Sequence, residues 1–188
     1  MVAGLDEVGR GPLAGPVIAA CVVLPESCDF KQFKDSKQLT HKQRLQLFAR
    51  LEEMGAVMGL GLVTEQEIDR INILQASLLA MKKALQSLTV VPDYLLVDGK
   101  FPVPVLTPQQ TLIKGESKSA SIAAASIVAK ITRDQLMADY HHQYPAYNFL
   151  KNQGYPTAEH RRALAEFGPC LIHRRSFKGV KEFFLPPP

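Results

Sequence analysis

The sequence has few cysteines, and none is placed for a shared site. Cys21, Cys28 and Cys170 are odd in number and show no C-x-x-C spacing. Secreted domains held by disulfides usually carry an even set of cysteines, and zinc sites usually carry closely spaced pairs. We therefore expect neither a disulfide framework nor a cysteine zinc site.

The sequence also lacks a long apolar run, a leader and repeats. Its longest fully apolar stretch, Val17–Leu24, is far shorter than the roughly 20 residues that span a bilayer. Acidic residues appear by Asp6 with no basic-then-apolar segment before them. We expect a cytoplasmic protein with no membrane anchor. The tail Pro186–Pro188 is predicted to be disordered.

Size and charge restrict the class of protein further. A chain of 188 residues, 46% of them hydrophobic and 21% charged, can bury one full core but not two large domains. We expect one domain over residues 1–185 and a monomer. The formal net charge is +4, and the excess gathers near the C-terminus at Arg161, Arg162, His173, Arg174, Arg175, Lys178 and Lys181. Such a distribution suits a polyanion such as nucleic acid, but it is also compatible with solubility alone.

Hydrophobic periodicity predicts strands alternating with helices. Helix starts are indicated at Thr40 and Thr64, and the first helix should bury Leu45, Phe48, Leu51 and Met54 before Gly55 ends it. The predicted strands are Val2–Leu5 and Pro16–Leu24 as a hairpin, then Ala56–Val63, Tyr94–Asp98 and Gln110–Ile113; the long helices are Ile73–Leu88 and Ser119–Tyr140. The fold class is α/β, a mixed sheet flanked by helices, with a helical C-terminal segment from about residue 140.

The segment Leu5–Pro12 concentrates the chemistry of the chain. Asp6 and Glu7 end the first predicted strand, and neighbouring strand side chains can serve one site only at a strand end. Gly9 and Gly11 allow a positive φ and a close approach of a ligand to the backbone. Arg10 between them is a fixed positive charge suited to a phosphate.

The segment has two other interpretations. Gly9–Gly15 is similar to a dinucleotide-binding glycine loop, but that fingerprint requires a following helix, and the β-branched run Pro16–Leu24 predicts a strand instead. A surface turn with incidental charges is the second alternative.

Further carboxylates stand at the ends of other elements. Asp98 ends an apolar strand, and Glu116 precedes the long alanine-rich helix. Clustered acids raise one another's pKa, so such a cluster implies bound cations, and ligation by oxygen alone favours Mg²⁺ or Mn²⁺ over zinc. Two such ions about 4 Å apart can activate a water and stabilise a leaving oxyanion at phosphorus.

Seven segments in order carry a family likeness: Asp6–Pro16, Asp35–Lys37, Val97–Gly99, Lys114–Glu116, Ser121–Lys130, Gly154–Thr157 and His173–Phe177. They resemble the motifs of type 2 ribonuclease H, ribonuclease HII, over nearly the whole chain. The resemblance implies an RNase H-like fold. It also favours type 2 over type 3, whose extra N-terminal domain would have no room before Asp6.

The resemblance implies that four acids, Asp6, Glu7, Asp98 and Glu116, hold two Mn²⁺ or Mg²⁺ ions. The family usually has aspartate after Lys-Gly, so Glu116 departs from the pattern by one methylene. Asp134 is the competing candidate for the fourth acid. It lies in a predicted helix beside Arg133, where a solvated face or an intrahelical ion pair is the simpler interpretation.

The resemblance also implies residues that bind the substrate. Gly9, Arg10 and Gly11 would surround a ribose 2′-hydroxyl and its phosphate, and Tyr155 would stack on the next deoxyribose. Contacts with backbone phosphates are expected from Lys37, His173, Arg174 and Arg175. The alternatives are a packing role for Tyr155 and a merely solvated basic surface for the others.

The activity that follows from the resemblance is hydrolysis of the RNA strand of RNA–DNA hybrids. It includes cutting at single ribonucleotides in duplex DNA, with 3′-hydroxyl and 5′-phosphate ends, for ribonucleotide and primer removal. The rivals are a nuclease of the same fold that acts on DNA alone and a basic binding module whose acids are structural. A sliding clamp could bind Phe183 and Phe184, although such a pair can also fold onto the core.

Overall fold

The computed structural model describes residues 1–33 and 39–185, with the side chains of residues 31 and 32 left out. The predicted phosphate contact Lys37 and the tail Pro186–Pro188 lie outside the described residues.

A five-stranded mixed sheet forms the centre of the molecule, in the order β3-β2-β1-β4-β5. Antiparallel pairs join β1 to β2 and β2 to β3, whereas β4 runs parallel to both β1 and β5. The predicted sheet and the β1–β2 pair are thus confirmed. The strands are β1 (Val2–Val8), β2 (Val17–Val23), β3 (Val57–Val63), β4 (Tyr94–Asp98) and β5 (Gln109–Leu112).

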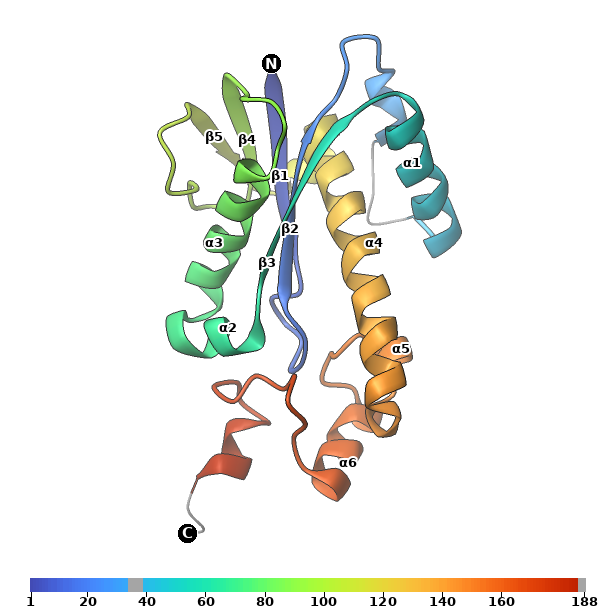
Figure 1. The fold of residues 1–188 in the computed structure, drawn as a ribbon, viewed down its shortest axis with the longest axis vertical. Helices are drawn as coiled ribbons and strands as arrows, with labels where there is room; N and C mark the ends of the chain where they lie inside the picture. The colour runs from blue at the N-terminus through green and yellow to red at the C-terminus, as the bar shows by residue number, and fades with distance from the viewer. Residues whose placement is uncertain (34–38, 186–188) are drawn as a thin grey trace.

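Helices cover both faces of this sheet (Figure 1). On one side lie α2 and α3, and on the other lie the long α4 and α1. The helices are α1 (His41–Glu53), α2 (Glu65–Ile71), α3 (Ile73–Gln86), α4 (Ala120–Gln143), α5 (Phe149–Asn152) and α6 (Ala158–Phe167). Short 3₁₀ turns among the described residues are η1 (Phe30–Phe33), η3 (Gly115–Ser117), η4 (Pro145–Tyr147) and η5 (Lys181–Phe184).

The predicted helix starts are confirmed, and one predicted core position is wrong. Thr40 and Thr64 each cap a helix in a reciprocal capping box. In α1, Leu51 is buried, but Leu45 is 44% exposed. Leu47 lies on the apolar face of the helix instead and packs with Phe48 against the core under α4.

The sheet separates two cores, one beneath α3 and one beneath α4. The close approach of α4 to β1 depends on Gly4, where a Cβ would lie 2.1 Å from the backbone carbon of Ser121. Gly4 and Asp6 share a face of β1 because side chains alternate along a strand. The face that α4 approaches is therefore the one that carries Asp6.

The C-terminal part forms a third cluster beyond the sheet, at the lower end of the molecule in Figure 1. Its side chains pack Leu13 and Ala14, from the loop after β1, against Met137 of α4. The predicted helical C-terminal segment is confirmed in α5 and α6, with turns between them.

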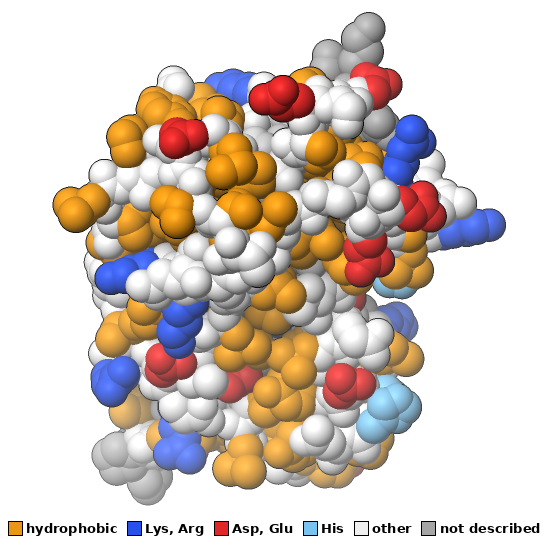
Figure 2. Space-filling view, turned by 45° about the horizontal axis from the view of Figure 1, so that its top comes forward, with side chains coloured by type: hydrophobic (Ala, Val, Ile, Leu, Met, Phe, Trp, Pro, Cys, Tyr) orange, Lys and Arg blue, Asp and Glu red, His pale blue; other side chains and the backbone are white. Residues whose placement is uncertain are grey.

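The surface is mixed in charge on the face drawn in Figure 2, where acidic and basic side chains are interspersed with hydrophobic ones. Within residues 1–33 and 39–185, no helix is long and apolar enough to cross a bilayer.

Candidate active site

Strand β1 is longer than predicted and carries both adjacent acids. It continues through Asp6 and Glu7 to Val8. Its pairing with β4, however, stops at Leu5, opposite Val97, whereas its pairing with β2 continues to Val8. Beyond Leu5, β1 is therefore unpaired on the side of β4 and still paired on the side of β2. This open edge lets both Asp6 and Glu7 line one pocket although they alternate in direction.

Three of the four predicted acids meet at this edge. Asp6, Asp98 and Glu116 each offer a carboxylate oxygen, and these oxygens lie within 4.8 Å of one another. We call these three residues the acid cluster. Glu7 lines the same pocket without belonging to this group. Its Oε1 accepts a hydrogen bond from Nη1 of Arg10 at 3.2 Å.

The turn before α4 brings Glu116 to the end of β4. Lys114 adopts a left-handed conformation with φ 56°, and the amide of Gly115 donates to Oδ1 of Asp98 at 2.6 Å. A Cβ at Gly115 would lie 2.6 Å from Cδ1 of Ile122 and 3.1 Å from that oxygen. Only glycine lets the backbone approach Asp98 this closely.

The electrostatics of the pocket favour a cation. Burial, and then the charges of Glu7 and Asp98, raise the pKa of Asp6 well above its ordinary value, against a side-chain hydrogen bond from Ser126. Burial also raises the pKa of Glu7, although Arg10 opposes this. Oε2 of Glu7 is buried without a hydrogen-bond partner. Carboxylate oxygens with this combination of burial and mutual repulsion fit a divalent ion such as Mg²⁺ or Mn²⁺.

Two buried arginines hold the loop Gly9–Pro16, which we call the glycine loop. Arg174 donates from Nη2 to the carbonyl of Gly9 at 2.5 Å and from Nη1 to that of Arg10 at 3.1 Å. Arg133 donates to the carbonyls of Ala14 and Pro16 at 3.1 and 3.2 Å. Burial and the neighbouring Arg133 lower the pKa of Arg174 to about 9, which leaves it charged at pH 7.

This arrangement also fixes the direction of two amides. In a trans peptide, the N–H points opposite to the carbonyl, and the chain contains no cis peptide bond among the described residues. Since the carbonyls of Gly9 and Arg10 point inward to Arg174, the N–H groups of Arg10 and Gly11 point away from it. Successive outward N–H groups suit a phosphate or a hydroxyl oxygen.

The two glycines of the predicted turn, Gly9 and Gly11, differ in backbone conformation and in their surroundings. Gly9 has φ 97°, and a Cβ there would lie 2.5 Å from Nε of Arg133. Gly11 does not have a positive φ, so only Gly9 uses the conformational freedom that both glycines allow. A Cβ at Gly11 would instead lie 3.5 Å from Cε1 of Tyr155. Tyr155 is 42% exposed and lines the pocket with the acids. The structure thus brings Tyr155 and Gly11 together.

The prediction that His173 and Arg174 contact phosphates is wrong for these side chains. Their exposed fractions are 2% and 0%. Arg174 binds the glycine loop, and His173 contacts His160 through their Nε2 atoms at 3.0 Å. Both groups lack the access to solvent that a nucleic-acid backbone requires. Arg175 is exposed, as are Arg161, Arg162, Lys178 and Lys181.

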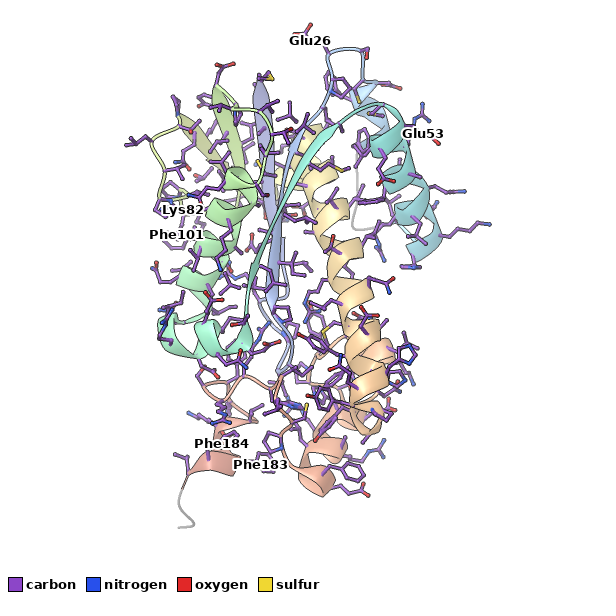
Figure 3. The ribbon with its side chains drawn as sticks, viewed as in Figure 1. Glu26, Glu53, Lys82, Phe101, Phe183 and Phe184 are labelled. Carbon is purple, nitrogen blue, oxygen red and sulfur yellow. The ribbon has the colours of Figure 1, made fainter. Side chains whose placement is uncertain are left out.

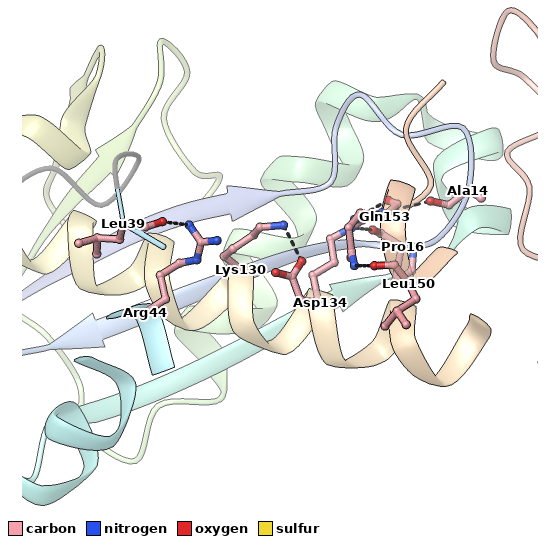
Figure 4. A network of polar contacts seen from close by, with 9 residues as sticks. Ala14, Pro16, Leu39, Arg44, Lys130, Asp134, Leu150 and Gln153 are labelled. Atoms are coloured by element: carbon pink, nitrogen blue, oxygen red, sulfur yellow. Dashed lines mark hydrogen bonds and ion pairs between the residues drawn. The ribbon is translucent and has the colours of Figure 1, made fainter. Parts of the chain in front are cut away.

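The pocket contains three polar residues that sequence reasoning missed as site residues: Arg44, Ser126 and Lys130. Lys130 pairs with Asp134 at 2.5 Å, and Arg44 donates to the carbonyl of Leu39 at 2.8 Å (Figure 4). Ser126 and Lys130 are four residues apart in a motif already singled out, a spacing that places both on one face of a helix. Asp134 forms the predicted intrahelical ion pair and lies outside the acid cluster.

The chain is similar to known proteins over nearly its whole length. The family model described as ribonuclease HII matches residues 3–180. A ribonuclease HII of Desulfotalea psychrophila is 63% identical over 186 residues, which cover 97% of this chain and 83% of the relative. A ribonuclease HII of Geobacter sulfurreducens is 54% identical over 181 residues, which cover 96% of this chain and 83% of the relative.

Solved structures show the same fold. The crystal structure of ribonuclease H2 from Pyrococcus horikoshii superposes with a TM-score of 0.80 at 28% identity, and the match covers 97% of this chain and 96% of that one. A ribonuclease HIII structure in complex with Mn²⁺ has a TM-score of 0.73 at 18% identity, covering 97% and 68%; this likeness shows the fold alone. The chain belongs to the ribonuclease HII family and is a ribonuclease H endonuclease.

Proposed function

We propose that the protein hydrolyses the RNA strand of RNA–DNA hybrids and also cuts duplex DNA at a single ribonucleotide, leaving 3′-hydroxyl and 5′-phosphate ends. The observation that carries the proposal is one pocket that contains the acid cluster together with Tyr155. The ring of Tyr155 lies beside Gly11 of the glycine loop. Acids for hydrolysis and groups suited to a sugar thus share one site.

Asp6, Asp98 and Glu116 would hold two divalent ions, Mg²⁺ or Mn²⁺, with Glu7 completing the ligands. When bound, such ions lower the pKa of a water nucleophile and stabilise the charge on the leaving oxygen. A ribonuclease HIII of this fold was solved with Mn²⁺, although at 18% identity that likeness shows the fold alone.

The glycine loop would sense the ribonucleotide. A 2′-hydroxyl can accept and donate a hydrogen bond, and it is the group that distinguishes RNA from DNA at one position. The outward N–H groups of Arg10 and Gly11 can bind it, or the adjacent phosphate, without contacting a base. Arg10, whose side chain is half exposed beside Glu7, adds positive charge for the phosphate.

The other groups of the pocket would position the two strands of the nucleic-acid substrate. Tyr155 would pack its ring on the deoxyribose next to the ribonucleotide, where a second hydroxyl would be excluded. Lys130 and Arg44 would bind phosphates, since both line the pocket and Nε of Arg44 is buried without a hydrogen-bond partner. These contacts would fix register without reading the base sequence.

The test is a cleavage assay on three labelled duplexes: an RNA–DNA hybrid, DNA with one ribonucleotide, and DNA alone. We expect the first two to be cut in Mg²⁺ or Mn²⁺, none in chelator, and the DNA duplex to stay intact. Cleavage of all three would instead favour a DNA nuclease. Tight binding without any cleavage would favour a binding module.

We propose further that residues 1–185 act as one cytoplasmic catalytic monomer with a docking tail. Phe183 and Phe184 lie on η5 near the C-terminus (Figure 3), 45% and 48% exposed, so they are not folded into the core. The ribonuclease HII of Archaeoglobus fulgidus was solved in complex with PCNA, although at 21% identity that likeness shows the fold alone. Binding of a purified sliding clamp that survives the double change Phe183→Ala and Phe184→Ala would exclude this contact.

A further inference from the structure

A chain of buried polar contacts runs from Tyr155 to the segment after α6. The carbonyl of Tyr155 lies 2.9 Å from Nδ1 of His160. Nε2 of His160 lies 3.0 Å from Nε2 of His173. The backbone N–H of Cys170 donates to Nδ1 of His173 at 2.9 Å. Each imidazole therefore uses both of its nitrogens.

These contacts allow one arrangement of protons. The amide of Cys170 can only donate, so Nδ1 of His173 must accept and its proton must lie on Nε2. That proton is donated to Nε2 of His160, whose own proton must then lie on Nδ1, from which it is donated to the carbonyl of Tyr155. Both histidines are neutral in this arrangement, as their burial favours.

Aromatic packing confines the two rings. His160 lies edge-on to Phe149, with centroids 5.4 Å apart, and His173 lies edge-on to Tyr147 at 4.9 Å. Their exposed fractions are 0% and 2%. The Tyr155 carbonyl also accepts a hydrogen bond from the amide of Thr157 at 2.8 Å, so this turn and the buried His160 together fix the direction of that carbonyl.

The same series of contacts is also connected to the glycine loop by hydrogen bonds. His173 bridges Ala14 in antiparallel fashion, and the amide of Arg174 donates to the carbonyl of Leu13 at 2.8 Å. On the other side, the amide of Leu13 donates to the carbonyl of Gly154, next to Tyr155, at 2.8 Å. The segment of residues 172–174 thus contacts the glycine loop directly and Tyr155 through His160.

We propose that His160 and His173 are positioning residues that fix Tyr155 against Gly11 and so determine the preference for a single ribonucleotide in DNA over a long hybrid. The inference rests on the proposed function, because it uses Tyr155 as the residue that meets the junction. Neither histidine contacts the substrate. They act by holding the backbone from which the Tyr155 ring extends.

Two amide substitutions separate the two contacts of His160. In His160→Asn the amide nitrogen can occupy the position of Nδ1, which keeps the donor to Tyr155 and loses the contact with His173. In His160→Gln the amide reaches the position of Nε2, which keeps His173 and loses Tyr155. Both variants leave similar space in the aromatic cluster, so general destabilisation should be similar.

The readout is the ratio of kcat/KM for duplex DNA with one ribonucleotide to kcat/KM for a long hybrid. We expect His160→Gln to lower this ratio roughly tenfold, as one lost hydrogen bond predicts, and Tyr155→Ala to lower it at least as much. His160→Asn should keep the ratio within about twofold. A ratio that is unchanged in His160→Gln, or lowered equally by both amides, would overturn the proposal.

A matched control separates positioning from loss of stability. Tyr147→Phe removes a hydrogen bond of 2.7 Å from the Tyr147 hydroxyl to the carbonyl of Gly168 within the same cluster. It should lower the free energy of unfolding and leave the substrate ratio unchanged. If this variant lowers the ratio as His160→Gln does, the effect is general softening and the positioning role is wrong.

A spectroscopic readout is independent of cleavage. Imidazole ¹⁵N shifts should show the proton of His160 on Nδ1 and that of His173 on Nε2 at pH 7. The opposite tautomer of His160 would overturn the proposal even in an active enzyme. Conversely, a wild-type protein that cuts no hybrid and no embedded ribonucleotide contradicts the proposed function, whichever tautomers the spectrum shows.

Discussion

The acid cluster and the glycine loop lie side by side in one site but are built in opposite ways. The acids stand at the end of paired strands, and burial together with the repulsion between their charges raises the pKa of Asp6. The glycine loop is held by two buried cations, Arg133 and Arg174, that donate to its carbonyls. The first region gathers carboxylates in an arrangement that fits a divalent cation, whereas the second is held by cations of the protein itself. Under the proposed function, the first region accepts metal and the second stays rigid.

Removing a charge from the acid cluster should have the largest effect on activity. We expect Asp98→Asn to abolish detectable cleavage, because the ions would lose a ligand and its charge. The same variant should fold normally or be more stable without metal, since repulsion with Asp6 falls. Cleavage and denaturant unfolding check the two parts. Near-wild-type activity of the purified variant would contradict the role of Asp98.

Replacing Arg174, which holds the glycine loop from outside, should act mainly on the stability of the protein. Arg174→Lys loses the planar fork that binds the carbonyls of Gly9, Arg10 and Gly15. We expect the free energy of unfolding to fall by about 2–4 kcal/mol, since buried acceptors are left without donors. The control is Arg175→Lys at an exposed neighbour. Equal, small losses in both would show that the loop does not depend on Arg174.

Variants of Glu116 test how the side-chain length and the charge of one acid in the acid cluster affect activity. Glu116→Asp should remain active and change the preference between Mg²⁺ and Mn²⁺, whereas Glu116→Gln should lose much of the activity, because the ions need charge as well as an oxygen. Rates in a titration of each metal measure both effects. If Asp134→Asn is the damaging change and Glu116→Gln is silent, the fourth acid has been assigned wrongly.

The two glycines of the loop should respond differently to alanine. Gly9→Ala adds a Cβ at φ 97° that would lie 2.8 Å from the carbonyl of Pro16, so we expect a loss above about 1 kcal/mol. Gly11→Ala places its Cβ in ordinary contact with Tyr155 and should change stability by less than about 0.5 kcal/mol. It should still lower kcat/KM by crowding the sugar. Equal destabilisation by both variants would contradict the description of the loop.

The smallest expected effect is a pH dependence of the free energy of unfolding that arises from the acid cluster. A carboxyl whose pKa is raised on folding favours the folded state below its ordinary pKa of 3.8, and this contribution is lost as pH rises toward the folded value. Asp6→Asn should therefore stabilise the metal-free protein more at pH 7 than at pH 4. Denaturant unfolding in chelator measures the difference. A gain that does not change with pH would argue against a raised pKa.

The same two regions show what the sequence predicts well. The acids follow apolar runs and belong to contiguous motifs, so the sequence identifies Asp6, Asp98 and Glu116 as site residues, and the structure brings them together. The sheet and both capping boxes likewise follow from local patterns. The supports of the glycine loop are separated from it by more than a hundred residues. No local pattern distinguishes a buried Arg174 from an exposed Arg175, so His173 and Arg174 were predicted to contact phosphate.

The most direct test of the account changes one substituent on one nucleotide. Three DNA duplexes should be prepared that are identical except for a hydroxyl, a hydrogen or a fluorine at a single 2′ position, and cleavage should be followed in Mg²⁺. If the acid cluster provides the chemistry and the glycine loop senses the 2′-hydroxyl, only the hydroxyl duplex is cut, and its products carry 3′-hydroxyl and 5′-phosphate ends. Equal cleavage of all three duplexes would show that the loop does not sense the ribonucleotide.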